Sequence, residues 1–168
     1  MKKIALFITL ITGAVTLQSC TIEEAYTEEY VSSVYELTTT FSEGNQYNTI
    51  YDFTRPLYDS DHVLIYRLWA TQDGDVWRLI PNTIFFNNGD EILYNYDHTK
   101  YDFSIFLEPN FPLNTLTANE RSLYLNNQTF RVVIIPGAFA GRTDFSDYDA
   151  TIKFLGLQNA PIKKLTTK

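Results

Sequence analysis

From Tyr30 onward, short apolar runs alternate along the chain with short polar segments. The runs are rich in Val, Ile, Thr, Tyr and Phe, and the segments between them contain Gly, Asn, Asp and Pro. This pattern predicts β-strands joined by turns, and helical periodicity is mostly absent. Residues 35–41 alternate in polarity, which predicts a half-buried first strand. Residues 43–45 then turn the chain into a second strand from about Tyr47 to Arg55.

Two longer runs, 62–71 and 129–135, are apolar on both faces apart from Arg67 and Arg131. Strands of this kind are buried on both sides, so both runs predict central strands. Two tight-turn signals predict hairpins: Asp73-Gly74 leads into 76–80, and Asn87-Asn88-Gly89 joins 84–86 to 91–97.

The remaining segments complete the expected order of elements. Tyr101, Phe103, Ile105 and Leu107 are expected to line one face of a further strand. Residues 56–61 and 110–122 read as loops, the second with no more than one helical turn, and Pro81 marks a bulge or an edge. One helix is predicted over 147–155, with Ser146 as its cap, Asp149 at the capping-box position and Gly156 after its end.

These elements predict a single all-β domain over residues 30–160. We expect an antiparallel β-sandwich of about seven to nine strands with one short C-terminal helix. Because two strands are apolar on both faces, the helix is expected to cover the outer face of one sheet. The tail 161–168 is basic and is expected to fray.

The N-terminal residues predict where the protein is exported and how it is anchored. Lys2 and Lys3 precede an apolar run to Leu17 that is too short to span a membrane, which predicts a secretory signal peptide over residues 1–19. The sequence Leu17-Gln18-Ser19-Cys20 resembles a lipobox, so Cys20 is predicted to carry lipid, including palmitate. Residues 20–29 then form an acidic tether.

The tether and the cysteine count refine this prediction. Glu23 and Glu24 resemble the surface-export signals of Bacteroidota lipoproteins, which favours an outer-membrane protein displayed outward. Cys20 is the only cysteine of the chain, so the mature domain has no disulfide and depends on its core.

Composition and motifs exclude several classes of function. The chain has 13 Lys and Arg against 20 Asp and Glu, a net charge of −7, which argues against nucleic acid as a partner. It has no Gly-x-Ser-x-Gly motif, and its two histidines, His62 and His98, read as ordinary polar residues at strand ends. No catalytic residue, cofactor or transition-metal site is predicted.

Oxygen-rich segments leave calcium as a weaker alternative. The candidate ligands are Asp59 with Asp61, Asp73 with Asp75, and Asp144 with Asp147 and Asp149. Aspartate is also the expected residue in turns and helix caps, and this second reading is favoured.

Aromatic residues are the compositional outlier, at 15% of the chain. Tyrosine and tryptophan present an apolar ring with a polar tip, as binding surfaces often do. Five rings fall near predicted hairpins and are the candidate ligand-binding residues: Trp69, Trp77, Tyr94, Tyr96 and Tyr101. The alternative is that these rings fill the core and cross-strand pairs of a disulfide-free sandwich.

The lipobox, the acidic tether and the runs 61–68 (DHVLIYRL) and 75–81 (DVWRLIP) resemble a family of uncharacterised Bacteroidota lipoproteins. Some of its members carry a collagen-like Gly-x-y segment after the lipidated cysteine, which this chain lacks. The resemblance implies an envelope lipoprotein but brings no activity or site residue with it.

The sequence therefore predicts a non-enzymatic binding module, held at the membrane through Cys20, whose ligand is a glycan or another envelope protein. Two alternatives stay open. One is a small envelope glycoside hydrolase that uses two carboxylates, and the other is a purely structural envelope lipoprotein.

Overall fold

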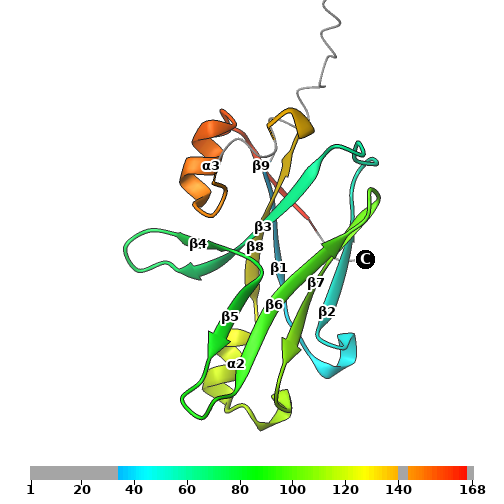
Figure 1. Ribbon diagram of the computed structural model, residues 1–168. Coiled ribbons are helices and arrows are strands. Elements are labelled where there is room, and N and C mark those ends of the chain that lie inside the picture. Colours follow the sequence, from blue (N-terminus) through cyan, green and yellow to red (C-terminus); the bar gives the residue numbers. More distant parts are fainter. Residues whose placement is uncertain (1–33, 140–143, 166–168) are drawn as a thin grey trace, which may run out of the picture.

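The computed structural model describes residues 34–139 and 144–165. The predicted signal peptide, Cys20 and the tether lie outside these residues. Within them, the chain forms two facing β-sheets (Figure 1). The strands of sheet A, in spatial order, are β4 (Val76–Leu79), β3 (His62–Ala70), β8 (Gln128–Ile135), β1 (Val34–Thr39) and β9 (Ile162–Lys164). Those of sheet B are β2 (Asn48–Asp52), β7 (Asp102–Pro109), β6 (Glu91–His98) and β5 (Asn82–Phe85).

The predicted antiparallel β-sandwich is confirmed. All strand pairs are antiparallel except β9 with β1. The two runs that are apolar on both faces form β3 and β8, which are interior strands of sheet A, as predicted. Gly74 and Gly89 adopt positive φ angles of 110° and 88° in the β3–β4 and β5–β6 hairpins, as the turn signals predicted.

The main core lies between the two sheets and is rich in aromatic rings. Phe41 packs edge-on against Tyr94 and Phe130, with ring centroids 6.1 and 6.2 Å apart, and Tyr51 stacks on Phe103 at 5.3 Å. Edge-to-face and offset pairs of this kind add to the free energy of burial. Aromatic side chains therefore supply much of the packing of a domain that has no disulfide.

A second core lies on the outer face of sheet A, under helix α3 (Tyr148–Phe154). Tyr148, Ile152 and Leu155 pack there against strand residues that include Val133 and Ile135. The Tyr66 hydroxyl of the sheet bonds the Phe145 carbonyl just before the helix at 2.7 Å and Thr151 Oγ1 within the helix at 2.9 Å. The helix thus covers the outer face of one sheet, as predicted.

Several details differ from the sequence predictions. The segment after β1 is no hairpin turn: a 3₁₀ turn, Glu43–Asn45, carries the chain from sheet A to sheet B, and β2 is shorter than expected. Ile80-Pro81, a cis peptide bond, likewise lies between β4 of sheet A and β5 of sheet B. The helix cap is Asp147 rather than Ser146, because the Asp147 carboxylate accepts from the Ala150 N–H at 2.8 Å.

The loop 110–122 and residues 162–164 of the tail also differ from the sequence predictions. The loop contains a 3₁₀ turn, Leu113–Thr115, and a second helix, α2 (Ala118–Tyr124), which Thr117 and Glu120 cap reciprocally. The basic tail supplies β9, because its Lys164 pairs with Glu36 at the edge of sheet A. Neither helix of the described segments is long and apolar enough to cross a membrane.

Candidate functional site at the end of the sandwich

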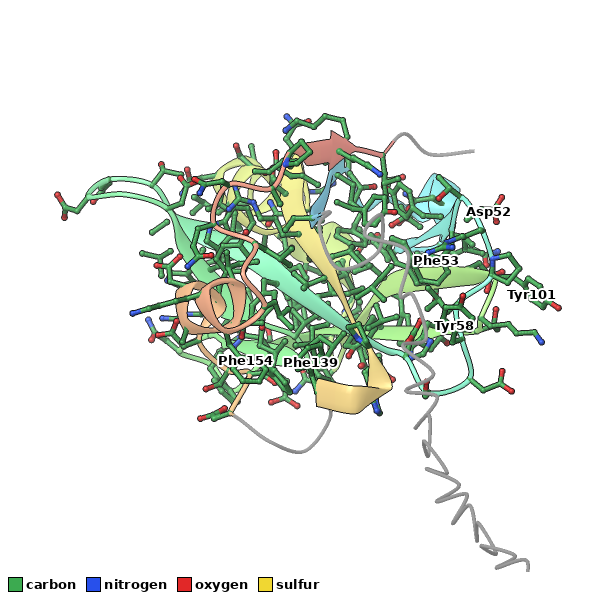
Figure 2. All side chains as sticks on the ribbon, turned by 90° about the horizontal axis from the view of Figure 1, so that it is seen from above. Asp52, Phe53, Tyr58, Tyr101, Phe139 and Phe154 are labelled. Carbon is green, nitrogen blue, oxygen red and sulfur yellow. The ribbon has the colours of Figure 1, made fainter. Side chains whose placement is uncertain are left out.

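Two loops meet at one end of the sandwich, and backbone hydrogen bonds join them. The β2–β3 loop spans residues 53–61, and the β6–β7 loop spans residues 99–101. The Phe53 N–H donates to the Tyr101 carbonyl, and the Leu57 N–H donates to the Lys100 carbonyl, both at 2.8 Å. Figure 2 looks onto this end, where Phe53, Tyr58 and Tyr101 lie together. The two loops therefore form one braced surface.

Each loop is also closed by its own side chains. The Asp61 N–H donates to the Tyr58 carbonyl at 3.0 Å, and the Tyr58 N–H donates to Asp61 Oδ2 at 3.1 Å. In the other loop, Thr99 Oγ1 donates to Asp102 Oδ1 at 2.6 Å and accepts from the Tyr101 N–H at 3.0 Å. Such side-chain-to-backbone bonds are why Asp and Thr favour turns.

The β2–β3 loop also packs closely against the turn that follows β8. Gly137, in the 3₁₀ turn Gly137–Phe139 after β8, lies against Ser60. A Cβ at position 137 would stand 2.5 Å from the Ser60 Cβ and 2.6 Å from its carbonyl oxygen. Only glycine permits this approach without movement of the loop.

The two loops form a shallow pocket of about 410 Å³, which we call the end pocket. Of its lining residues, Leu57 is buried and Tyr58 is 55% exposed. The lining residues are Leu57, Tyr58, Asp59, Asp61, His98, Thr99 and Lys100. The pocket thus combines an accessible ring with hydrogen-bond donors and acceptors, which is the usual make-up of a small-ligand site.

Asp61 gives this pocket an unusual feature. The residue is only 9% exposed, and its Oδ1 atom is buried without a hydrogen-bond partner in the described part of the chain. A buried acceptor left unsatisfied costs about 1–3 kcal/mol, so such atoms call for an explanation. Asp61 is one of the pocket-lining residues, so a small movement of its carboxylate would bring this oxygen within reach of a ligand hydroxyl or N–H group.

The five aromatic residues predicted to form a platform are not brought together. Tyr94 is fully buried, and Tyr96 is half-buried, with its hydroxyl donating to the Val63 carbonyl at 2.7 Å. Tyr101 is 57% exposed and precedes β7, so it does not share the inner face of Phe103, Ile105 and Leu107 as predicted. Tyr101 alone of the five lies beside the pocket, next to Lys100.

The two tryptophans lie on opposite faces of the β3–β4 hairpin. Trp69 is 38% exposed, and the Arg78 guanidinium covers its ring at 3.6 Å. Trp77 faces α3, with the Arg131 guanidinium 4.1 Å from its ring centre and the Tyr148 ring at 5.5 Å. Cation–π pairs of this kind hold both rings against the protein.

The predicted calcium ligands are divided among separate places. Asp59 and Asp61 belong to the end pocket, whereas Asp75 lines a groove with Asp147 and Asp149 beside Trp77. Within residues 34–139 and 144–165, no three His, Cys, Asp or Glu side chains stand close enough to share a metal ion. His62 is exposed at the start of β3 and is not a pocket-lining residue, whereas His98, at the end of β6, is one.

The carboxyl groups with clearly shifted pKa values are shifted downward. Burial acts to raise the pKa of Glu36, but hydrogen bonds from Lys164 and Arg131 outweigh it and bring the pKa below the ordinary value. Hydrogen bonds from Thr117 lower the pKa of Glu120, and those from Ser146 lower the pKa of Asp144. A general acid of a glycoside hydrolase needs the opposite shift, so these three groups do not suit that role.

Sequence reasoning missed Leu57, Tyr58, Thr99 and Lys100 as site residues. The available signal was the loop Pro56 to Asp61, where a tyrosine stands among turn-forming residues. Comparisons of the chain with protein-family models, with curated proteins and with solved structures each gave no match. The site must therefore be interpreted from its own chemistry.

Proposed function

We propose that this chain is a non-enzymatic binding module of the cell envelope, tethered through lipid at Cys20, which binds a glycan in the end pocket. The buried, unpartnered Oδ1 of Asp61 is the observation that carries the proposal. A sugar hydroxyl is a donor of the right kind for this carboxylate, and the exposed ring of Tyr58 offers an apolar surface for the C–H face of a sugar.

The mixed charge of the pocket favours a neutral ligand. The lining includes two acidic residues, Asp59 and Asp61, and one basic residue, Lys100. A strongly anionic ligand would meet the two carboxylates, and a strongly cationic one would meet Lys100. Hydroxyl groups both donate and accept, so they suit both kinds of side chain.

The bracing of the loops supports the proposed binding. The hydrogen bonds of Phe53 and Leu57 to the neighbouring loop hold the pocket before a ligand arrives. Preorganisation of this kind reduces the ordering cost of binding. It also agrees with a shallow surface site whose role is recognition.

The test is a glycan array with the purified protein, followed by calorimetric titration of the best glycan. Tyr58→Ala and Asp61→Asn should each weaken binding by about tenfold, equal to about 1.4 kcal/mol. Phe85→Ala is the matched control, because Phe85 is the more exposed aromatic side chain at 76% and lies on β5.

The control should bind as the unmodified protein does. An array without any bound glycan would refute the proposal. Binding that Phe85→Ala weakens as much as Tyr58→Ala does would place the glycan outside the end pocket.

A further inference from the structure

Charged residues segregate between the two sheets. The strands of sheet B contain no lysine or arginine, whereas those of sheet A contain Arg67, Arg78, Arg131, Lys163 and Lys164. The acidic residues of the sheet B strands are Asp52, Glu91, Asp97, Asp102 and Glu108. Because side chains alternate along a strand and the core takes the other set, all of these acids project from the outer face of sheet B.

An apolar line crosses the same outer face from edge to edge. Ile50 and Phe85 stand at its ends and are 51% and 76% exposed, and the half-buried Phe106 and Leu93 lie between them. The register places each of these residues diagonal to the next on the neighbouring strand. Diagonal neighbours are about 7–8 Å apart, so the four side chains form one continuous stripe.

The two sheets differ in how their outer faces are covered. Helix α3 packs on sheet A, and Tyr148 and Ile152 are buried by that contact. Strands β5, β6 and β7 of sheet B carry no helix of the described chain over their outer side (Figure 1). The apolar stripe belongs to neither of the two core clusters. Exposed apolar surface rimmed by charge marks an interaction site more often than isolated apolar residues do.

We propose that the outer face of sheet B docks a basic polypeptide segment whose apolar side chains lie on the stripe. Glu91 and Glu108 lie opposite Phe85 and Leu93 in the register. They would pair with lysine or arginine of the partner, which gives the interface its charge complementarity. A second copy of this chain fits less well, because two such faces would bring acid against acid. No residue of the stripe lines the end pocket, and the proposal does not depend on the proposed glycan binding.

The probe for this surface is a fluorescent peptide of alternating lysine and leucine, with a glutamate and leucine peptide as the charge-reversed control. Binding to the full chain is followed by anisotropy. The stripe variant is Ile50→Ser with Phe85→Ser, and the charge variant is Glu91→Gln with Glu108→Gln. The matched control is Asp73→Asn with Asp75→Asn, which changes the net charge equally at the exposed tip of the β3–β4 hairpin.

We expect the stripe and charge variants each to weaken binding of the basic peptide by about tenfold, and the hairpin control by less than about twofold. Equal weakening by the hairpin control would show general attraction to an acidic protein and would overturn the proposal. Binding that is indifferent to the stripe variant, or absent, would overturn it as well.

Two further measurements separate this proposal from its rivals. Sedimentation of the protein alone tests for self-association, and a dimer that Ile50→Ser with Phe85→Ser disrupts would assign the face to a second copy instead. Tyr58→Ala should bind the basic peptide normally. A failed glycan array would therefore leave this proposal standing, and a failed peptide titration would leave the glycan proposal standing.

Discussion

Gly137 and Ser60 touch so closely that their contact leaves no room for a side chain. A Cβ at position 137 would meet three atoms of Ser60 at 2.5 to 2.9 Å, and one of them is the backbone oxygen. The loop that carries Tyr58 and Asp61 is thus seated on the turn that follows β8. The shape of the end pocket depends on this contact.

Replacing Gly137 by alanine should destabilise the protein and shift this loop. Overpacking costs about 1–3 kcal/mol, because the Ser60 backbone must move. Thermal unfolding should show a lower Tm for Gly137→Ala, and glycan affinity should fall with it. Gly44→Ala is the matched control, since the new Cβ would meet only the Ser42 Oγ at 3.7 Å. Equal Tm values for the two variants would contradict the prediction.

Lipidation at Cys20 stays a prediction from the sequence and can be tested directly. Cells that express the full chain and are labelled with palmitate should yield a labelled protein, and Cys20→Ser should abolish the label and release the protein from the membrane fraction. Thr21→Ser, one residue beyond, should leave both unchanged. A labelled Cys20→Ser protein would disprove the assignment.

The sequence predicted most of the fold because the fold rests on local signals. The alternating polarity of residues 35–41 predicted a half-buried strand, and the runs apolar on both faces predicted the central strands β3 and β8. The turn signal at Gly74 predicted the hairpin. Helix α2 was missed although Thr117-x-x-Glu120 is a capping-box signal, because none of its residues is buried and no apolar face marks it, whereas α3 has such a face. Strand β9 could not be foreseen, since Lys163 and Lys164 have no apolar pattern and gain their place from the edge of β1.

The candidate site was harder to predict because it is assembled from distant segments. Asp61 was noted in the sequence as a weak calcium-ligand candidate and as a turn residue, not as part of a pocket, and Lys100 was not noted at all. They share a pocket because β2 pairs with β7 and β6 pairs with β7, which brings the two loops to one end. The aromatic prediction failed to form a single platform for the same reason. Register and sheet membership, rather than composition, decide which rings are exposed.

The stability of the fold should depend on the hydrogen bonds between the buried Arg67 guanidinium and the Gln128 side-chain amide. Arg67 is 4% exposed, its Nη2 and Nε donate to Gln128 Oε1 at 2.5 and 3.0 Å, and its guanidinium lies 4.1 Å from the centre of the Tyr94 ring. Burial lowers the pKa of Arg67. Removing the acceptor with Gln128→Leu should cost about 1.5–3 kcal/mol, because the buried charge loses both bonds to Gln128 and keeps only the longer one to the Leu123 carbonyl, at 3.4 Å.

Replacing both Arg67 and Gln128 should lower the free energy of unfolding by less than the sum of the two single replacements. Arg67→Met with Gln128→Leu leaves no unpaired charge, so the double variant should be more stable than Gln128→Leu alone. Chemical denaturation of the two single variants and the double variant measures the coupling. Strictly additive free energies of unfolding would show that the Arg67–Gln128 contact carries no net interaction.

Two buried tyrosines should make the fold sensitive to alkaline pH. Burial raises the pKa of Tyr66 and of Tyr94 to about 12, from an ordinary value of 10.0, despite opposing effects of a Thr151 hydrogen bond on Tyr66 and of the Arg67 charge on Tyr94. The unfolded chain therefore releases these protons at a lower pH than the folded chain does. The stability they contribute is fully present below pH 10 and is lost as the pH rises towards 12.

Each tyrosine should account for about 1–3 kcal/mol of this loss, measured as the free energy of unfolding in urea at several pH values. Tyr66→Phe should flatten its share of the pH dependence, since phenylalanine does not ionise. At neutral pH the same variant should be less stable, because the Phe145 carbonyl and Thr151 Oγ1 lose the hydroxyl that bonds them at 2.7 and 2.9 Å. Tyr58→Phe, with an exposed ring, is the control and should retain the full alkaline loss. An unchanged pH profile in Tyr66→Phe would mean that Tyr66 ionises equally in the folded and unfolded chains.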